Sequence, residues 1–376
     1  MAIGIKGPAK YVQGRNILPT TGLLCANLGS RFYLLCSENT KRRYGAILEK
    51  SFKDESKDLV YGQFTGKCTK NVIYNCMQEV QTQKCDVVIG MGGGKALDTA
   101  KAVADNLGGL PVVMVPTIAS NDAPCSGVAV IYSEEGEVKK ALFTRQNPDL
   151  VLVDTQIIAD APPRFLAAGI GDALSTYYEV KAVKASGALT FSGGTCSNTA
   201  YALAKLCHEI LISDGIYAYC SAKNHLVTKA LDNVIEATIY LSGLGFESGG
   251  IAAAHAIHDG LARLPETKDT YHGEKVAFGT ICQLILENED PIVIEKLLHF
   301  LIKLDLPVTL QQLGLSRKNH EALLSVAQTA CAPEQFAGNM PFTVNPCDIY
   351  DAMLFCDTLG ESLINNRAIE AVAPNS

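Results

Sequence analysis

The chain has 376 residues, of which 48% are hydrophobic, and a formal net charge of −7. This length allows two domains with their own cores, and the apolar content excludes a largely disordered chain. The acidic balance argues against nucleic acid or an anionic membrane surface as a partner, and no apolar run is long enough to span a bilayer. The thirteen cysteines contain no Cys-x-x-Cys pair. Together with the absence of a secretory signal, this pattern indicates reduced thiols and predicts a cytoplasmic protein.

Short apolar strands and helical patterns alternate over the first 160 residues. Apolar residues at helical spacing predict an amphipathic helix over 71–84. The β-branched, apolar runs predict buried strands at 31–36, 86–91, 111–116 and 149–154. Such alternation is typical of a doubly wound α/β fold with a mostly parallel sheet. Two further runs, 128–132 and 139–143, flank a charged segment and predict a β-hairpin.

A glycine-rich stretch, Gly92-Gly93-Gly94-Lys95, lies where the strand 86–91 passes into a helical pattern. Backbone N–H groups at a helix start lack intrahelical partners, and the helix dipole is positive there. Without side chains on three successive residues an anion can approach the backbone, so the stretch predicts a cradle for a pyrophosphate. The pattern matches neither of the two common phosphate loops. A tight turn that needs glycine for its dihedral angles is the alternative interpretation.

The loop 116–122 follows the next predicted strand. Ligands on parallel sheets collect at the carboxyl ends of the strands, so this loop and the glycine-rich stretch should line one crevice. Strand signals then disappear, and helical patterns continue to residue 366. The pair Pro162-Pro163 is therefore a plausible boundary between an α/β domain, 1–161, and an all-helical domain, 162–376.

Three polar residues in the helical half stand among small and apolar neighbours: Asp172, His255 and His272. A carboxylate and two imidazoles suit a divalent transition metal and leave a position open for water or substrate, as in catalytic sites. The alternative is that Asp172 caps a helix and His255 is a hydrogen-bonded core histidine beside His258. Spacing alone leaves both interpretations open, because the three residues form no local motif.

Five segments together resemble the glycerol dehydrogenases of the iron-containing (type III) alcohol dehydrogenase superfamily. They are GGGKALDTAK (92–101), PTIASNDAP (116–124), GIGDA (169–173), GFESGG (245–250) and HGEKVAFG (272–279). The resemblance covers nearly the whole chain. It implies a dinucleotide-binding α/β domain, a helical domain, and an active site in the cleft between them.

The resemblance also implies roles for individual residues. Zinc would be held by Asp172, His255 and His272, which with Asp122 would be the catalytic and substrate-binding residues. The implied NAD contacts are Gly94, Lys95, Thr117, Ser120, Ser126, Val128 and Tyr132, to which the glycine-rich motif adds Gly92, Gly93 and Asp98, and the end of the strand 31–36 adds Ser37. The family usually has an aspartate at the position of Ser37. A carboxylate at this position would repel the 2′-phosphate of NADP. Because this chain has a serine there, the choice between NAD and NADP stays open.

The activity implied is a reversible, NAD- and zinc-dependent oxidation of glycerol, or a related vicinal diol, to dihydroxyacetone by hydride transfer. The implied partners are a small polyol and further copies of the chain, in a large homo-oligomer such as an octamer. Two alternatives with related architecture are glycerol-1-phosphate dehydrogenase and dehydroquinate synthase, whose anionic substrates call for a cluster of cations. A third is a non-catalytic nucleotide-binding module, which has no need of an open metal position.

Overall fold

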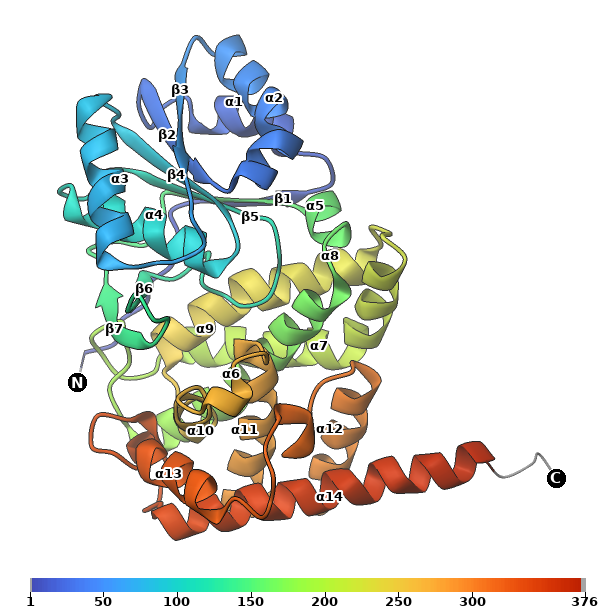
Figure 1. Ribbon diagram of the computed structural model, residues 1–376. Coiled ribbons are helices and arrows are strands. Elements are labelled where there is room, and N and C mark those ends of the chain that lie inside the picture. The colour runs from blue at the N-terminus through green and yellow to red at the C-terminus, as the bar shows by residue number, and fades with distance from the viewer. Residues whose placement is uncertain (1, 373–376) are drawn as a thin grey trace. The chain divides into compact units, whose positions relative to one another are not determined.

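The computed structural model describes residues 2–372, which form two compact units (Figure 1). The sheet unit contains residues 5–166 and 217–247. The helical unit contains 2–4, 167–216 and the described chain from 248 onward. The domain boundary between residues 161 and 162 stays a prediction.

The sheet unit is built on six parallel strands, as the alternating pattern predicts. They are β1 (Tyr11–Gly14), β2 (Arg31–Cys36), β3 (Asp58–Gln63), β4 (Val87–Gly92), β5 (Val112–Pro116) and β8 (Leu150–Asp154). Their spatial order is β1-β8-β5-β4-β2-β3. The four predicted strands are the four inner strands of this sheet. The two edge strands, β1 and β3, were not predicted.

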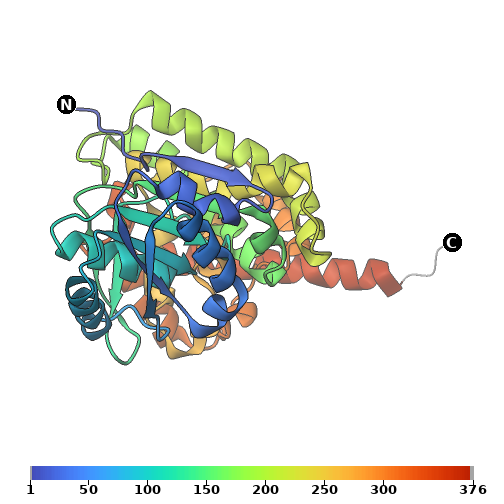
Figure 2. The ribbon, with the colours of Figure 1, turned by 90° about the horizontal axis from the view of Figure 1, so that it is seen from above.

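Helices cover both faces of this sheet. They are α1 (Thr21–Cys25), α2 (Glu38–Asp54), α3 (Lys70–Thr82), α4 (Gly94–Asn106) and α5 (Thr155–Ala159), with a 3-10 turn η1 (Leu18–Thr20). Figure 1 shows α1 and α2 on one side of the strands and α3 and α4 on the other, and the view from above keeps this order (Figure 2). The helix predicted over 71–84 is therefore confirmed as α3. Two-sided cover explains why the inner strands read as continuous apolar runs.

Alternate residues of the inner strands make the core on the α2 face. Phe32 and Leu34 of β2, Ile89 of β4 and Val113 of β5 are at most 1% exposed and pack with Phe52 of α2. On the opposite face α4 lies very close to the sheet, because a Cβ on Gly90 would meet the Ala100 Cβ at 2.7 Å. This tight packing holds α4, which begins in the glycine-rich stretch, directly against the sheet.

After β5 the sheet unit continues into a β-hairpin that is separate from the six-stranded sheet. Strands β6 (Val128–Tyr132) and β7 (Val138–Phe143) pair antiparallel, with an irregularity between Ile131 and Tyr132. The hairpin predicted from the two apolar runs is thus confirmed. A later segment completes the unit as α8 (Lys229–Glu236), a π-helical turn η2 (Ala237–Leu241) and α9 (Ser242–Gly249). Such turns interrupt α-helices rarely, and often at functional sites.

Helices dominate the chain from residue 163 onward, and the described part of it contains no named strand. They are α6 (Pro163–Ser186), α7 (Asn198–Lys223), α10 (Ala253–Leu261), α11 (His272–Leu286), α12 (Pro291–Lys303), α13 (His320–Ala330) and α14 (Pro346–Val372), with 3-10 turns η3 (Pro265–Thr267), η4 (Gln311–Leu313) and η5 (Phe336–Asn339). The predicted succession of an α/β sheet and a largely helical C-terminal region is therefore confirmed.

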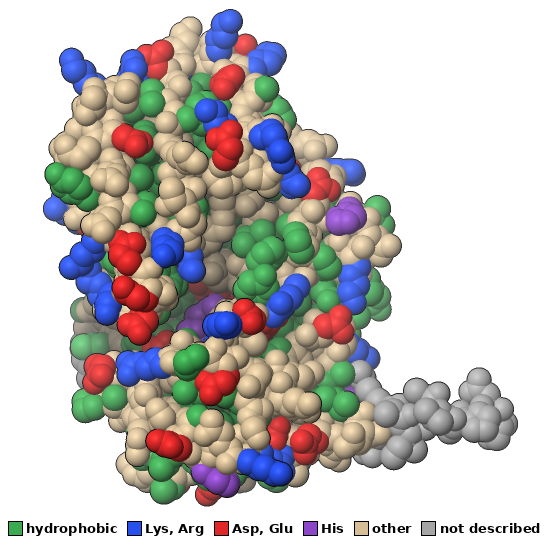
Figure 3. All heavy atoms as spheres, viewed as in Figure 1, with side chains coloured by type: hydrophobic (Ala, Val, Ile, Leu, Met, Phe, Trp, Pro, Cys, Tyr) green, Lys and Arg blue, Asp and Glu red, His purple; other side chains and the backbone are tan. Residues whose placement is uncertain are grey.

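The surface carries charges of both signs. Acidic and basic side chains are interspersed over the face drawn in Figure 3, without a continuous basic area on that face. Among the described residues, no helix combines the length and apolarity that a membrane crossing requires.

Candidate active site

Asp172, His255 and His272 come together in the helical unit, as the sequence predicts for a metal site. One ligand atom from each lies within 4.8 Å of the other two. The Nε2 atoms of His272 and His255 lie 3.0 and 3.6 Å from Asp172 Oδ1. That oxygen is buried and no hydrogen bond satisfies it. This buried carboxylate oxygen and the two Nε2 atoms beside it fit a divalent metal ion. The interpretation of Asp172 as a helix cap is not supported, since the residue lies inside α6.

Glycines allow the helices that carry these ligands to approach. A Cβ on Gly273 of α11 would lie 1.8 Å from the Ala168 carbonyl oxygen of α6. A Cβ on Gly279 would lie 2.5 Å from the Ala254 carbonyl oxygen of α10. Any side chain at either position would force the helices apart. The small residues noted around each ligand in the sequence therefore serve to bring α6, α10 and α11 into contact.

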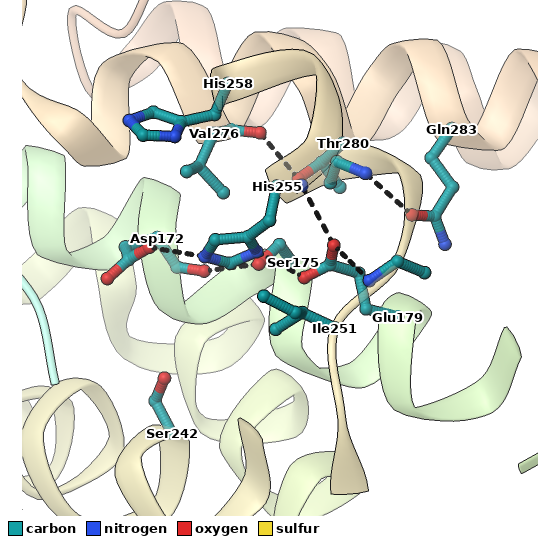
Figure 4. Close-up of polar contacts among 12 residues, drawn as sticks. Asp172, Ser175, Glu179, Ser242, Ile251, His255, His258, Val276, Thr280 and Gln283 are labelled. Carbon is teal, nitrogen blue, oxygen red and sulfur yellow. Dashed lines mark hydrogen bonds and ion pairs between the residues drawn. The ribbon is translucent and has the colours of Figure 1, made fainter. Parts of the chain in front are cut away.

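Each imidazole ligand has a second partner on its other ring nitrogen. His255 Nδ1 lies 2.6 Å from Oε2 of Glu179, so the ring lies between Asp172 and Glu179 (Figure 4). His272 Nδ1 lies 2.8 Å from His258 Nε2, and His258 Nδ1 lies 3.0 Å from Oδ1 of Asp259. These contacts suit an Nδ1–H donor on both ligands, so that Nε2 is the ring nitrogen available to a metal ion.

The cluster shifts the pKa values of its members. Burial alone would raise the pKa of Asp172, but His272 and His255 hold it well below its usual range. Burial would lower the pKa of His255, but Glu179 and then Asp172 raise it well above the ordinary value. Burial, followed by repulsion from His272, lowers the pKa of His258 to about 4. Groups whose pKa values are shifted this strongly by burial and by neighbouring charges are typical of functional sites.

The glycine-rich stretch forms the predicted strand-to-helix turn in the sheet unit. Gly92 ends β4, Gly93 is the N-cap of α4, and Gly94 is its first residue. The backbone is closely approached here, since a Cβ on Gly93 would meet the Ile118 side chain at 2.9 Å. Lys95 Nζ lies 4.9 Å from the centre of the Tyr132 ring. Two predicted cofactor residues from different elements are thus neighbours.

Asp98 and Lys101 form a buried ion pair on α4. Lys101 Nζ lies 2.9 Å from Asp98 Oδ1, and their side chains are 1% and 9% exposed. Lys101 also donates to the carbonyl oxygens of Ala123 and Val128, and Asp98 Oδ2 accepts from the Val130 N–H. The pair fastens α4 to the loop before β6 and to β6 itself. Its members therefore hold the segment that contains Ser126 and Val128.

Two residues of α9 hold the same loop. Ser242 Oγ donates to Asp122 Oδ2 at 2.6 Å. The buried Glu247 accepts from the Gly127 N–H at 3.2 Å and from Asn147. Burial raises the pKa of Glu247, against the lowering effect of Asn147. Asp122 is therefore a fixed side chain in a braced loop.

The remaining predicted cofactor residues lie at the carboxyl ends of the inner strands. Thr117 and Ser120 follow β5. Ser37 follows β2 and caps α2, accepting a hydrogen bond from the Thr40 N–H at 3.2 Å. Beside this helix start, a cavity of about 330 Å³ is lined by residues of α2, among them Arg43, and by Thr117. This arrangement leaves the sheet unit room for a ligand beside the first turns of α2.

Sequence reasoning missed the residues that support the site rather than form it. These are Glu179, Gln283, Lys101, Ser242 and Glu247, and all are buried. One signal was present: Glu179 lies seven residues after Asp172, close to two helical turns, between the apolar Tyr178 and Val180.

Comparisons with known proteins agree with this site. Residues 8–155 match the family model described as iron-containing alcohol dehydrogenase. The chain is 44% identical to a glycerol dehydrogenase of Escherichia coli O6:H1, over 96% of this chain and 98% of that enzyme. It is 43% identical to a glycolaldehyde reductase of Halobacterium salinarum, over 94% of this chain and 97% of the relative. The crystal structure of glycerol dehydrogenase from Schizosaccharomyces pombe superimposes with a TM-score of 0.92 at 34% identity, covering 98% of this chain and 93% of that one.

Family membership thus follows from similarity along nearly the whole chain, and the metal site of Asp172, His255 and His272 supports it independently. The chain belongs to the iron-containing alcohol dehydrogenase family, and within it to the glycerol dehydrogenase group.

Proposed function

We propose that this protein oxidises glycerol to dihydroxyacetone reversibly, with NAD as cofactor and Zn²⁺ held by Asp172, His255 and His272. The observation that carries the proposal is this triad in a chain so similar to a glycerol dehydrogenase. When bound, the cofactor supplies a hydride acceptor and the metal ion supplies a Lewis acid that makes a substrate hydroxyl more acidic.

The residues of the sheet unit bind the cofactor in this proposal. Backbone N–H groups at Gly94 and Lys95, at the positive end of α4, would hold the pyrophosphate, and the Lys95 ammonium would neutralise its charge. Ser37 and the cavity beside α2 accommodate the adenosine half. Asp98 acts indirectly, since its carboxylate is engaged by Lys101 and the Val130 N–H. Thr117, Ser120, Ser126, Val128 and Tyr132 complete the contacts.

Substrate and ion are oriented by fixed carboxylates. Asp122 accepts a hydrogen bond from a glycerol hydroxyl, and Ser242 keeps its side chain in place. Asp172 provides the negative charge of the metal site, while the two histidines present Nε2 lone pairs. A small, uncharged polyol suits this set better than a phosphorylated substrate does, because an anionic substrate calls for a cluster of cations.

A second candidate reaction is the reduction of a small hydroxyaldehyde with NADH. The 43% identity to a glycolaldehyde reductase favours it as an additional activity. The chemistry is the reverse hydride transfer on a shorter substrate, so the same residues would serve.

A spectrophotometric screen tests both candidates. Glycerol, vicinal diols, secondary alcohols and glycolaldehyde are offered with NAD(H) or NADP(H), with and without a chelator. We expect steady NADH formation from glycerol that a chelator abolishes and Zn²⁺ restores. Turnover of glycerol 1-phosphate alone would favour that dehydrogenase, and cofactor binding without any turnover would favour a nucleotide-binding module. The homo-oligomer and the cytoplasmic location remain predictions, the former testable by light scattering.

A further inference from the structure

The fully buried carboxylate of Glu179 contacts the metal ligand His255 at Nδ1, the ring nitrogen that does not face Asp172. Glu179 of α6 has 0% of its surface exposed. Its Oε1 accepts from the N–H groups of Ala252 at 2.8 Å and His255 at 2.9 Å, and its Oε2 lies 2.6 Å from His255 Nδ1. All three contacts go to the start of α10. A buried carboxylate is costly unless its oxygens are satisfied, and here both are.

These contacts replace a cap that α10 cannot make for itself. Its N-cap residue is Ala252, which has no side chain able to accept a hydrogen bond. Glu179 takes the N–H groups of the N-cap and of the third helical residue, His255, which a capping box would normally satisfy from within the helix. Gln283 Oε1 accepts from the Ala254 N–H at 3.0 Å. The negative charge of Glu179 also lies at the positive end of the helix.

The two helices that supply these caps also supply the other two metal ligands. Helix α6 carries Asp172 and, seven residues later, Glu179. Helix α11 carries His272 and, eleven residues later, Gln283. Seven and eleven residues are close to two and three helical turns, so the ligand and the cap share one face of each helix. The position of α10 is therefore fixed by the same two helices with which it shares the ion.

We propose that Glu179 is a positioning residue of the metal site: it fixes the His255 ring with the proton on Nδ1, so that the Nε2 lone pair faces Asp172 and His272. The proposal deepens the proposed function, because it rests on the same metal site. An ionised carboxylate can only accept hydrogen bonds, so it selects the Nδ1–H form of the ring. The backbone contacts of the same carboxylate hold the ring's own helix, so orientation and position are set together.

Replacement of Glu179 by Gln separates the two roles. Glutamine offers one acceptor and one donor group where glutamate offers two acceptors. If its oxygen keeps the two backbone N–H groups, its NH₂ group faces His255 Nδ1 and drives the proton to Nε2, which can then no longer bind a metal ion. We expect the dissociation constant for Zn²⁺ or Co²⁺ to rise about 10–100-fold. The melting temperature of the metal-free protein should stay near that of the wild type.

The measurement uses the full-length, metal-stripped protein and the metal ions alone. Competition with a chromogenic chelator gives the affinity for Zn²⁺, and the visible absorption of bound Co²⁺ reports the ligand geometry. Neither readout requires turnover of glycerol. A wild-type protein that binds Co²⁺ but does not oxidise glycerol would therefore contradict the proposed reaction and leave this proposal standing.

Two further variants complete the test. Gln283→Ala removes a cap of α10 without touching an imidazole, so it should lower the melting temperature and change the metal affinity less than Glu179→Gln does. Asp357→Asn changes another buried carboxylate of the helical unit, one that accepts from the Leu310 N–H, and should leave the metal affinity unchanged. Wild-type affinity in Glu179→Gln would overturn the proposal. So would an affinity loss no larger than that of Gln283→Ala, because capping alone would then explain it.

Discussion

Ser242 Oγ donates a hydrogen bond to Asp122 Oδ2 at 2.6 Å, although the two residues are 120 positions apart in the chain. The contact joins the first residue of α9 to the loop between β5 and β6. A carboxylate held in this way has a fixed orientation. This is the property that a substrate-orienting residue needs.

Removal of the Ser242 hydroxyl should weaken glycerol binding. The net value of one such hydrogen bond is about 1 kcal/mol, so Ser242→Ala should raise the KM for glycerol roughly fivefold. The KM for NAD should hardly change. Steady-state kinetics with each substrate varied will measure both, with Ser213→Ala, an exposed serine of α7, as the control. A rise in the KM for NAD alone would contradict the assignment of Asp122 to the substrate.

Replacement of His255 should remove metal and turnover together. His255→Ala eliminates one of the three ligands, so we expect bound zinc to fall below stoichiometry and kcat to fall more than about 100-fold, beyond the usual cost of losing a supporting residue. Elemental analysis and NADH formation give the two values. His299→Ala, on the surface of α12, serves as the control. Normal activity in a metal-free His255→Ala protein would refute the metal site.

The Lys95 ammonium should contribute to cofactor affinity. Hydrogen bonds to charged groups are worth about 1.5–3 kcal/mol, so Lys95→Ala should raise the KM for NAD roughly 10–100-fold. Metal affinity should be unaffected. Initial rates at saturating glycerol will show the effect, and Lys84→Ala, outside the glycine-rich stretch, should behave as the wild type. An unchanged KM for NAD would place the pyrophosphate elsewhere.

The buried Asp98–Lys101 pair should be important for stability. Lys101→Met leaves the Asp98 carboxylate buried without its counter-ion, which typically costs about 3–5 kcal/mol. Chemical denaturation of the variant and of Lys139→Met, an exposed lysine of β7, will show the difference. The double variant Asp98→Asn/Lys101→Met should recover part of the loss. A single variant as stable as Lys139→Met would show that the pair contributes little.

Lys275 should make stability depend on pH in the alkaline range. Burial lowers its pKa to about 8 in the folded protein, and its Nζ donates to the Thr270 carbonyl oxygen at 2.6 Å. The unfolded chain, with an ordinary lysine pKa of about 10.4, binds more protons between these two values. The free energy of unfolding should therefore gain an increment as pH rises from 8 to 10. Denaturation curves of the wild type and Lys275→Met over this range will isolate the increment, which the variant should lack.

The inner strands of the sheet could be predicted because strands that are buried on both faces consist of consecutive apolar residues. The edge strands could not. β3 begins with the exposed Asp58, ends with the exposed Gln63 and has only Gly62 fully buried, and β1 has only four half-buried residues. Each edge strand is held by backbone hydrogen bonds to the adjacent strand. These bonds do not require a particular pattern of side chains.

The metal ligands were candidates from their residue types alone and were singled out by the family resemblance, whereas the residues that support them were not predicted. Asp172, His255 and His272 stand out as polar residues among small ones. Glu179 and Gln283 occur in helices where glutamate and glutamine are ordinary surface residues, and only the packed structure makes them buried caps of α10. Residue type can suggest a metal ligand. It does not show which backbone N–H groups of another helix a side chain will contact.

The π-helical turn Ala237–Leu241 comes immediately before the residues that brace the Asp122 loop. One residue more or less in a helix rotates everything that follows by about 100°. A single-codon deletion there would point Ser242 and Glu247 away from the Asp122 loop, while leaving the amino acids of that loop unaltered. Selection should therefore act more strongly on the number of residues in this segment than on their identity. We expect related sequences to show substitutions here but few insertions or deletions.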